Sequence, residues 1–379
     1  SKSNMYLKKL SLTNFKNYKS ASFEFSPRIN CFVGSNGAGK TNILDSIHYL
    51  SLAKSFYSNI DSISINHGED YFIIEGVFSE DAAESSVVCS FHRQKQKVLK
   101  RNGKEYERLI DHVGRYPVVM ISPADSALVT EGSEERRRFL NKIISQYDPE
   151  YLDCILNYNK VILQRNRLLK SYGKSGNLTP ELTEAYDLQL VKYGEYIHRE
   201  RSRLVDELTP VFNDYYTFIS SGNEMMKLSY RSQLSGTAFT ELLRKNAEKD
   251  RVLEYTTAGI HKDDLVFELN GYPVRTFGSQ GQQKSFLVAL KLAKFDYIKR
   301  KTGLTPILLL DDIFDKFDSE RVEKIIKLAG NHRFAQIFIT DTDEMRMKGI
   351  LARLDVVHRL FRIAKDNEIE IVSELKTDI

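Results

Sequence analysis

The sequence predicts an α/β protein whose head contains a mixed, partly parallel sheet and an antiparallel β subdomain, with a helical lobe inserted into it. Residues 5–123 are rich in β-forming residues between short turns, residues 124–222 have helical periodicity, and strands alternate with helices after residue 280. Such alternation favours parallel pairing, because a helix returns the chain to the starting edge of the sheet. We therefore predict one discontinuous head domain, 5–123 and 223–379, with 124–222 inserted.

Strands dominate the first part of the chain. Apolar residues from Leu7 onward lead into Phe15–Tyr18, and Asn102-Gly103 is a strong hairpin signal because both residue types tolerate positive φ. Further strands are expected at 21–25, 29–33, 71–78, 87–91, 97–101 and 118–121.

Helical spacing marks the middle of the chain. Apolar residues predict helices over 134–147 and 151–172, and Thr179-Pro180-Glu181 is a good start for a helix that continues to about Ile219. The second half then returns to a mixed texture. Strands are expected at 227–230, 264–269, 307–310 and 336–340, and helices at 237–251 and 285–298.

Composition excludes several classes of protein. The 379 residues carry 55 Lys and Arg against 51 Asp and Glu, a net charge of +4, which does not by itself require a nucleic-acid partner. No run approaches the ~20 apolar residues of a membrane helix, so we expect no membrane partner. Three widely spaced cysteines argue against disulfides and zinc and favour a cytoplasmic location.

A phosphate-binding motif follows the expected strand 29–33. Residues 34–41 fit G-x-x-x-x-G-K-[ST], in which glycines let successive N–H groups face phosphate oxygens. Lys40 would reach the β- and γ-phosphates of ATP, and the Thr41 hydroxyl would bind Mg²⁺. The alternative is a coincidental glycine turn, but the strand–loop–helix order favours the motif. The expected ATP-binding residues here are Gly34, Ser35, Asn36, Gly37, Ala38, Gly39, Lys40, Thr41 and Asn42.

A second motif is the apolar run 306–310, which ends in Asp311 and Asp312. Carboxylates at the carboxyl end of a buried parallel strand lie where ligands bind in open α/β sheets. Asp311 would hold Mg²⁺, and Asp312 would orient or deprotonate the attacking water, so Asp312 and Lys40 are the expected catalytic residues. An ordinary acidic helix start is the alternative.

The segment Ser279, Gln280, Gly281 and Gln282 opens the helix before the acidic strand and resembles the signature loop of ABC-type ATPases. In that class the loop of one subunit contacts the γ-phosphate bound to the other, again through anion binding at a helix end. Taken alone, the segment is a glycine-rich helix cap. Its position between the other two motifs gives it weight.

Within that class the chain resembles the RecF family of bacterial DNA-repair proteins, which are related to the heads of SMC proteins. The resemblance rests on 12–18 (LTNFKNY), 122–125 with 132–140, and 259–265, and it extends from Met5 to about Ile363. It adds Lys16 and Asn17 to the expected ATP-binding residues. Thr340-Asp341-Thr342 stands where transporter ATPases carry a histidine.

The resemblance implies an ATP-dependent homodimer that clamps DNA at junctions of single and double strands. It implies a weak, DNA-stimulated ATPase that acts in gap repair, DNA replication and the SOS response. RecA loading with RecR, and RecO as a further partner, is also implied. Two alternatives stay open: a nucleotide-gated structural clamp with negligible hydrolysis, and the ATPase subunit of a transporter.

Two basic clusters are candidates for DNA contact through the phosphate backbone. Residues 91–108 carry seven basic side chains against two acidic ones, and 136–138 is an arginine run. Ordinary alternatives are a charge-protected edge hairpin and salt bridges to Glu134 and Glu135. The residues assigned to DNA are Lys95, Lys97, Lys100, Arg101, Arg136 and Arg137.

Overall fold

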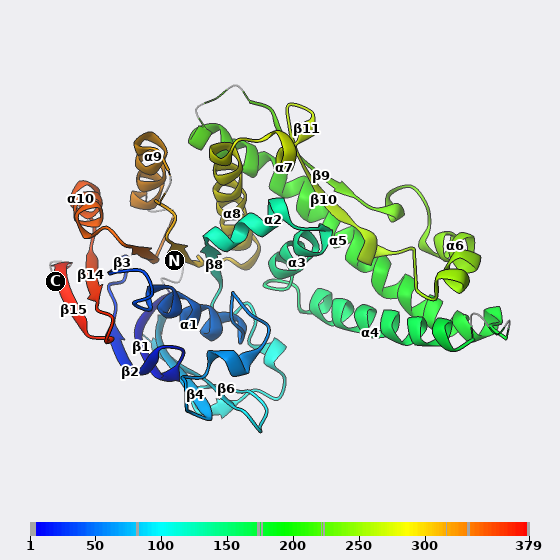
Figure 1. Cartoon of the computed structure of the whole chain (residues 1–379), viewed down its shortest axis with the longest axis horizontal. Helices are drawn as coiled ribbons and strands as arrows, with labels where there is room; N and C mark the ends of the chain where they lie inside the picture. Colours follow the sequence, from blue (N-terminus) through cyan, green and yellow to red (C-terminus); the bar gives the residue numbers. More distant parts are fainter. Residues whose placement is uncertain are drawn as a thin grey trace. The chain divides into compact units, whose positions relative to one another are not determined.

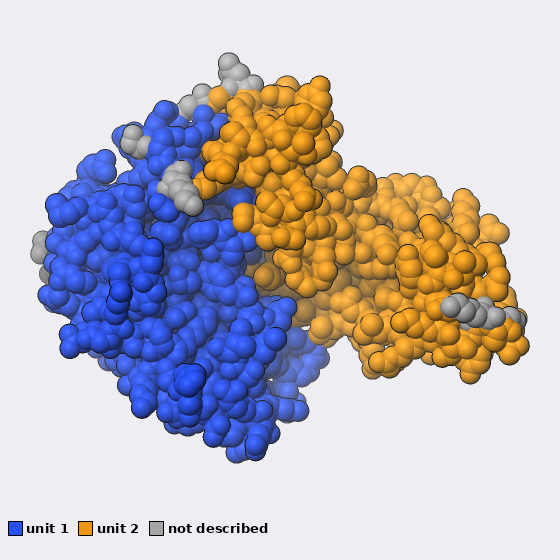
Figure 2. Space-filling view, in the orientation of Figure 1, with its two compact units in different colours: residues 1–125, 218–221, 287–379 blue, residues 126–217, 222–286 orange. Residues whose placement is uncertain are grey.

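The computed structural model describes residues 5–80, 83–172, 175, 177–220, 222, 224–315, 317–331 and 334–376 (Figure 1). The chain divides into two compact units, which Figure 2 colours separately. Unit 1 comprises residues 1–125, 218–221 and 287–379, and unit 2 comprises 126–217 and 222–286. The predicted helical lobe therefore falls almost wholly in unit 2.

Unit 2 also takes in residues 223–286, which the sequence interpretation assigns to the head. A physical reason is visible in the side chains, because Arg136 of the helical segment forms an ion pair with Asp264, 128 residues away. The domain boundaries at 123 and 223 stay a prediction.

Unit 1 contains the predicted antiparallel sheet, with its strands in the order β2-β1-β4-β5-β6-β7. The Asn102-Gly103 turn joins β6 and β7 with φ of 50° and 77° at its two residues, as predicted. The bounds are β1 (Tyr6–Phe15), β2 (Tyr18–Glu24), β4 (Tyr71–Glu80), β5 (Ala83–His92), β6 (Val98–Arg101) and β7 (Lys104–Glu105).

The second sheet of unit 1 has the order β15-β14-β3-β13-β12-β8 and is mixed, as predicted. Every pairing in it is parallel except that of β15 with β14. Its strands are β3 (Ile29–Val33), β8 (Val118–Ile121), β12 (Ile307–Asp311), β13 (Ile337–Asp341), β14 (His358–Ile363) and β15 (Ile369–Leu375). Strands from early and late parts of the chain are thus neighbours in this sheet, with β3 lying between β14 and β13.

Aromatic side chains fill the core of unit 1. Phe25 of the loop after β2 meets Phe338 of β13 edge to face at 4.8 Å between ring centroids, and Phe32 of β3 stacks on Phe361 of β14 at 5.3 Å. Helices α1 (Lys40–Leu52), α9 (Ser319–Gly330) and α10 (Glu344–Leu354) complete the unit, together with residues 287–302 of α8 (Gln280–Thr302).

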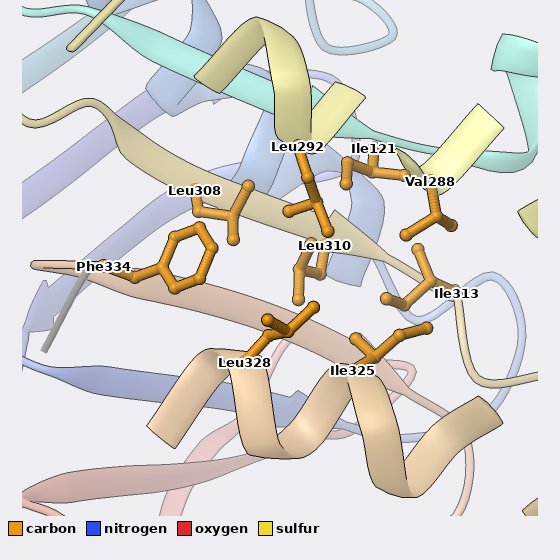
Figure 3. A pocket seen from close by; sticks show the side chains of 9 residues that line it. All are labelled: Ile121, Val288, Leu292, Leu308, Leu310, Ile313, Ile325, Leu328 and Phe334. Carbon is orange, nitrogen blue, oxygen red and sulfur yellow. The ribbon is translucent and has the colours of Figure 1, made fainter. Parts of the chain in front are cut away.

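Strand β12 is buried along its whole length. A small apolar cavity lies beside it, and Figure 3 shows leucine, isoleucine, valine and phenylalanine side chains pointing into it. Leu308 and Leu310 line this cavity while Ile307 and Leu309 pack in the core of unit 1, so burial on both faces explains why the run before Asp311 contains no polar residue. The all-apolar lining excludes this cavity as a nucleotide site. The lining residues are Ile121, Val288, Leu292, Leu308, Leu310, Ile313, Ile325, Leu328 and Phe334.

Unit 2 combines long helices with an antiparallel sheet in the order β11-β10-β9. The predicted helix across Pro210 is continuous from Pro180 to Ser220. The helices are α2 (Ala127–Thr130), α3 (Ser133–Ile144), α4 (Pro149–Tyr172), α5 (Pro180–Ser220), α6 (Phe239–Leu253) and α7 (Val274–Phe277). The strands are β9 (Met226–Arg231), β10 (Asp264–Leu269) and β11 (Tyr272–Pro273). Among the helices of the described segments, none is both long and apolar enough to cross a membrane.

Candidate nucleotide site

Three parallel strands bring the predicted motifs of unit 1 to one edge of a sheet. Strand β13 pairs with β3 on one side and with β12 on the other, so Gly34, Thr340 and Asp311 follow or end neighbouring strands. The carboxyl edge of a parallel sheet is where α/β proteins bind ligands. The phosphate motif and the acidic motif, far apart in sequence, therefore meet.

The phosphate loop has the backbone that its glycines permit. Gly34, Gly37 and Gly39 have φ of 156°, 80° and 103°. A Cβ at Gly34 would overlap the carbonyl of Ile363, and one at Gly39 would overlap the side-chain amide of Asn17. Helix α1 begins at Lys40, and the N–H groups of Asn42 and Ile43 donate to Gly39 O at 3.1 and 3.3 Å. The helix start can therefore offer the N–H groups of Lys40 and Thr41 to an anion.

Lys40 closes over the loop that precedes it. Its ammonium group donates to the carbonyls of Gly34 at 2.6 Å and Ser35 at 2.8 Å. Burial lowers the pKa of Lys40, and the carboxylates of Asp312 and Asp311 oppose that change. Neutral carbonyl groups thus hold the lysine at the loop. A charged phosphate oxygen would be a stronger acceptor and could take their place.

Asp311 is surrounded by hydroxyl donors. Thr41 Oγ1 donates to it at 2.9 Å, Tyr57 at 2.6 Å and Thr340 at 2.7 Å. The pairing of Thr41 with Asp311 unites the two expected Mg²⁺ residues. Sequence reasoning missed Tyr57 and Thr340. The position of Thr340 at the end of a predicted strand was a usable signal, whereas nothing around Tyr57 distinguishes it from a core aromatic.

Asp312 differs from its neighbour. It adopts a left-handed φ of 49°, and its N–H donates to Thr340 Oγ1 at 2.9 Å. Its Oδ1 is buried and has no hydrogen-bond partner among the described residues. Burial raises the pKa of Asp312, and the charges of Asp315 and Asp311 raise it further. An unmatched carboxylate oxygen beside an all-oxygen donor set suits a hard cation such as Mg²⁺.

Lys16 and Asn17 lie beside the loop, but their side chains are occupied by protein groups. Lys16 pairs at 2.5 Å with Asp45, whose side chain is fully buried. The Asn17 amide donates to Ala38 O and accepts from Asn42, so Asn17, Ala38 and Asn42, three of the expected ATP-binding residues, contact one another. Their role in ATP binding stays a prediction.

The signature segment lies in unit 2 and caps α8. Ser279 N–H donates to Gln282 Oε1 at 2.7 Å, and Gln282 N–H donates to Ser279 Oγ at 3.2 Å, which is a reciprocal capping box. Gln282 also donates to Glu224 at 2.6 Å. Ser279 and Gln280 are exposed, and the helix begins at Gln280, one turn earlier than predicted.

The basic residues assigned to DNA separate into two groups. Lys95 and Lys100 are exposed on the β5–β6 hairpin of unit 1. Lys97 instead pairs with Asp61 at 2.8 Å, and Arg101 donates to Tyr116 at 3.0 Å and to Ser85 at 3.2 Å.

The arginine run of unit 2 is likewise engaged. Arg136 forms two hydrogen bonds to the Asp264 carboxylate, at 2.7 and 3.2 Å. Arg137 donates to Ser133 Oγ at 2.7 Å and to the carbonyl of Asp263 at 2.9 Å. The sequence did not show that these side chains have partners more than a hundred residues away.

The phosphate loop, the acidic strand and the capped signature segment define an ABC-type head of the kind found in SMC-like proteins. A family model, the RecF/RecN/SMC N terminal domain, matches residues 6–367. The chain is 47% identical to the DNA replication and repair protein RecF of Parabacteroides distasonis over 361 residues, 95% of this chain and 98% of that protein. It is 45% identical to RecF of Flavobacterium johnsoniae over 359 residues, 95% of this chain and 100% of that protein. The chain belongs to the RecF family of DNA replication and repair proteins.

Solved structures agree with this assignment. The recombination mediator protein RecF-ATP in the RecFOR pathway matches with a TM-score of 0.87 at 29% identity, over 97% of this chain and 98% of that one. The Smc head domain of Pyrococcus furiosus matches with a TM-score of 0.58 at 16% identity, over 97% of this chain and 96% of that one, which shows the fold alone. None of these matches supports the transporter alternative.

Proposed function

We propose that this chain is an ATP-dependent DNA-binding protein of recombinational gap repair and a weak, DNA-stimulated ATPase. The observation that carries the proposal is the meeting of the loop 34–41 with Asp311 and Asp312 at one sheet edge. Support also comes from a relative at 29% identity, which is described as bound to ATP in the RecFOR pathway.

The residues of unit 1 divide the work on ATP and Mg²⁺. The loop amides and the first turn of α1 bind the phosphates, and Lys40 binds their terminal oxygens. Thr41 and Asp311 hold the cation, with Asp311 oriented by Tyr57 and Thr340. Held by these two residues, Mg²⁺ would supply positive charge against the charge that develops on the phosphates during hydrolysis. Asp312 orients the attacking water and accepts its proton.

A second copy of the chain completes the site. Ser279, Gln280, Gly281 and Gln282 of that copy face the γ-phosphate with the amino end of α8, because a helix start favours an anion. The capping box holds these residues in place in the absence of nucleotide. ATP therefore promotes a two-site dimer, and hydrolysis reopens it.

DNA and protein partners follow from the family. The dimer binds junctions of single- and double-stranded DNA through phosphates, with Lys95 and Lys100 as the contacts of the hairpin. RecR, with RecO as a further partner, joins it to load RecA, and the protein acts in the cytoplasm. The RecFOR description of the solved relative supports this setting.

A second candidate is a nucleotide-gated clamp with negligible hydrolysis. Asp341, in the segment that replaces the transporter histidine, is bound by Arg346 at 2.9 and 2.6 Å and is therefore engaged rather than open to the nucleotide. The two candidates share ATP binding and dimerisation and differ only in turnover.

Sedimentation velocity with ATP and Mg²⁺ tests the proposal, with and without a duplex carrying a single-stranded gap. Wild type is expected to shift from monomer to dimer and to bind the DNA, whereas Lys40→Ala stays monomeric. A wild type that stays monomeric with ATP and binds no DNA contradicts the proposal. Phosphate release in the same samples separates the two candidates.

A further inference from the structure

The turn between β14 and β15, residues 364–368, reaches the phosphate loop through one pair of side chains. Asn367 Nδ2 donates to the backbone carbonyl of Asn17 at 2.7 Å, and Asn17 Nδ2 donates to Asn367 Oδ1, also at 2.7 Å. The two residues are 350 positions apart in sequence. The pair is reciprocal, because each asparagine gives one hydrogen bond and receives one.

Asn17 carries this connection on to the loop. Its Nδ2 also donates to Ala38 O at 3.3 Å, and its Oδ1 accepts from Asn42 of α1 at 2.7 Å. The next residue, Tyr18, donates its hydroxyl to Gly39 O at 3.1 Å. Asn17 and Tyr18, where β2 begins, therefore donate hydrogen bonds to two successive carbonyls of the phosphate loop. Asn367 in turn donates to the backbone carbonyl of Asn17.

The direction of these carbonyls determines where the loop N–H groups point. In a trans peptide the C=O and the following N–H lie on opposite sides of the bond. Fixing Ala38 O and Gly39 O on the Asn17 side therefore turns the N–H groups of Gly39 and Lys40 to the other side. Those groups belong to the loop and helix start that favour an anion.

Asn367 also fits its turn by conformation. Its φ is 68°, in the left-handed region that asparagine tolerates better than most residues. Its N–H donates to Ala364 O at 3.0 Å, and Ala364 N–H donates to Glu368 O at 3.0 Å, which closes the turn. The turn thus presents the Asn367 amide in a fixed orientation.

We propose that Asn367 is a positioning residue of the nucleotide site, acting through Asn17 to keep the phosphate loop ready for an anion. The inference rests on the proposed function, since it concerns the same site. On this view the β14–β15 hairpin contributes to nucleotide affinity. The Asn17 side chain stabilises the phosphate loop, because its amide is already hydrogen-bonded to protein groups.

The test is equilibrium titration with a fluorescent ATP analogue, together with thermal unfolding of the nucleotide-free protein. Asn367→Gly keeps the left-handed turn and removes the amide. We expect roughly fivefold weaker binding, about the factor that one net hydrogen bond contributes, with an unfolding temperature close to that of wild type. Lys365→Ala, an exposed change in the same turn, is the matched control and should bind as wild type does.

Asn367→Ser is the second variant, for use if Asn367→Gly does not fold. It removes the amide that donates to the Asn17 carbonyl without adding a charge beside the phosphate loop, so weakened binding again supports the inference. Wild-type affinity in a folded Asn367 variant overturns it, and so does a lower unfolding temperature with unchanged affinity. A wild type that binds no nucleotide overturns the proposed function and, with it, this inference.

Discussion

The two units contain buried charges that are balanced in different ways. In unit 2, buried Arg165 donates to Asp187 at 2.7 Å and to Asp250 at 2.7 Å, and both carboxylates belong to other helices. At the sheet edge of unit 1, Asp311 receives hydroxyl groups, and within the described part of the chain neither Asp311 nor Asp312 forms an ion pair. Arg165 thus neutralises the buried carboxylates of unit 2, whereas hydroxyl groups contact Asp311 at this sheet edge of unit 1, although Asp45 elsewhere in unit 1 pairs with Lys16.

This difference distinguishes a scaffold from a binding site. Burying a carboxylate without a cation costs folding free energy. A protein that keeps such a group at a sheet edge therefore uses it for binding and not for stability. Removing Arg165 should therefore destabilise unit 2, whereas removing the charge of Asp312 should leave the folding of unit 1 nearly unchanged and affect only turnover. The predictions below test that contrast, in order of decreasing effect.

Asp312→Asn should have the largest effect. We expect turnover to fall by about 10²–10⁴-fold, the usual contribution of a general base, while the ATP-dependent dimer still forms. Steady-state phosphate release and sedimentation with ATP measure the two properties. Asp70→Asn, at an exposed position of unit 1 before β4, is the control and should turn over as wild type does. Turnover equal to wild type in Asp312→Asn would remove Asp312 from its assigned role.

Arg165→Met should cost unit 2 about 3–5 kcal/mol of unfolding free energy, because Asp250 would be left buried and unpaired. Urea unfolding measures this loss. Arg167→Met, two residues further along α4 on its exposed side, should change stability by less than ~0.5 kcal/mol. Equal stability of the two variants would contradict the view that unit 2 needs its internal cation.

A partly buried histidine gives unit 2 a pH dependence. His261 Nε2 donates to Thr256 O at 2.9 Å, so Nδ1 accepts from the Tyr158 hydroxyl at 2.9 Å. Burial is the main cause that lowers the pKa of His261 to about 4, against its ordinary value of 6.5. The unfolded chain therefore takes up the proton first, and stability that is complete above pH 6.5 is lost as pH falls towards 4.

The full loss would be on the order of 3 kcal/mol. Urea unfolding at pH 7 and pH 4.5 measures it, and His261→Gln should flatten the dependence. His67→Gln, at an exposed position of unit 1, should leave the dependence unchanged. A wild type that is equally stable at both pH values would contradict the prediction.

The arginine run offers a comparison between neighbouring side chains. Arg136 is 14% exposed and paired with Asp264, whereas Arg138 is 47% exposed and paired with Glu134 and Glu135. We expect Arg136→Ala to cost about 2 kcal/mol and Arg138→Ala less than ~0.5 kcal/mol. Both substitutions remove one positive charge. If Arg136→Ala lost DNA affinity without losing stability, the arginine run would be a DNA contact and not a structural ion pair.

The smallest expected effect is on DNA. Reversing Lys95 and Lys100 to glutamate should weaken duplex binding and lower the salt slope by about two, because each phosphate that a lysine no longer neutralises lowers it by close to one unit. Lys19→Glu with Lys170→Glu, also exposed, changes the net charge equally and is the control. An unchanged slope in the first pair would exclude the hairpin as a DNA surface.

The sequence was most informative where chemistry depends on neighbours in the chain. The loop 34–41 and the acidic strand were predicted because their spacing is local, and the strand at 29–33 was predicted with the bounds that the structure shows. Strands at 358–363 and 369–375 were not predicted, because charged residues interrupt their apolar pattern. Arg362 of β14, for example, pairs with Glu344 and Glu370.

The site residues that sequence reasoning missed act across the fold. Tyr57 reaches Asp311 from 254 residues away, and Asn367 reaches Asn17 from 350. The assignment of the basic clusters to DNA stays a prediction, and the sequence could not show which of their side chains have partners within the protein. The sequence alone does not distinguish an exposed lysine such as Lys100 from one that forms an ion pair, such as Lys97 with Asp61.

The order of the central sheet has a consequence for biosynthesis. Strand β3 is made early, yet both of its neighbours, β13 and β14, come from residues 337–363. At ~5–20 residues per second, a ribosome needs on the order of tens of seconds to reach them. During that interval an apolar strand has unpaired edges, and the phosphate loop after it has no acidic strand to meet. The nucleotide site can therefore assemble only after residues 337–363 have left the ribosome, long after the phosphate loop itself has been made.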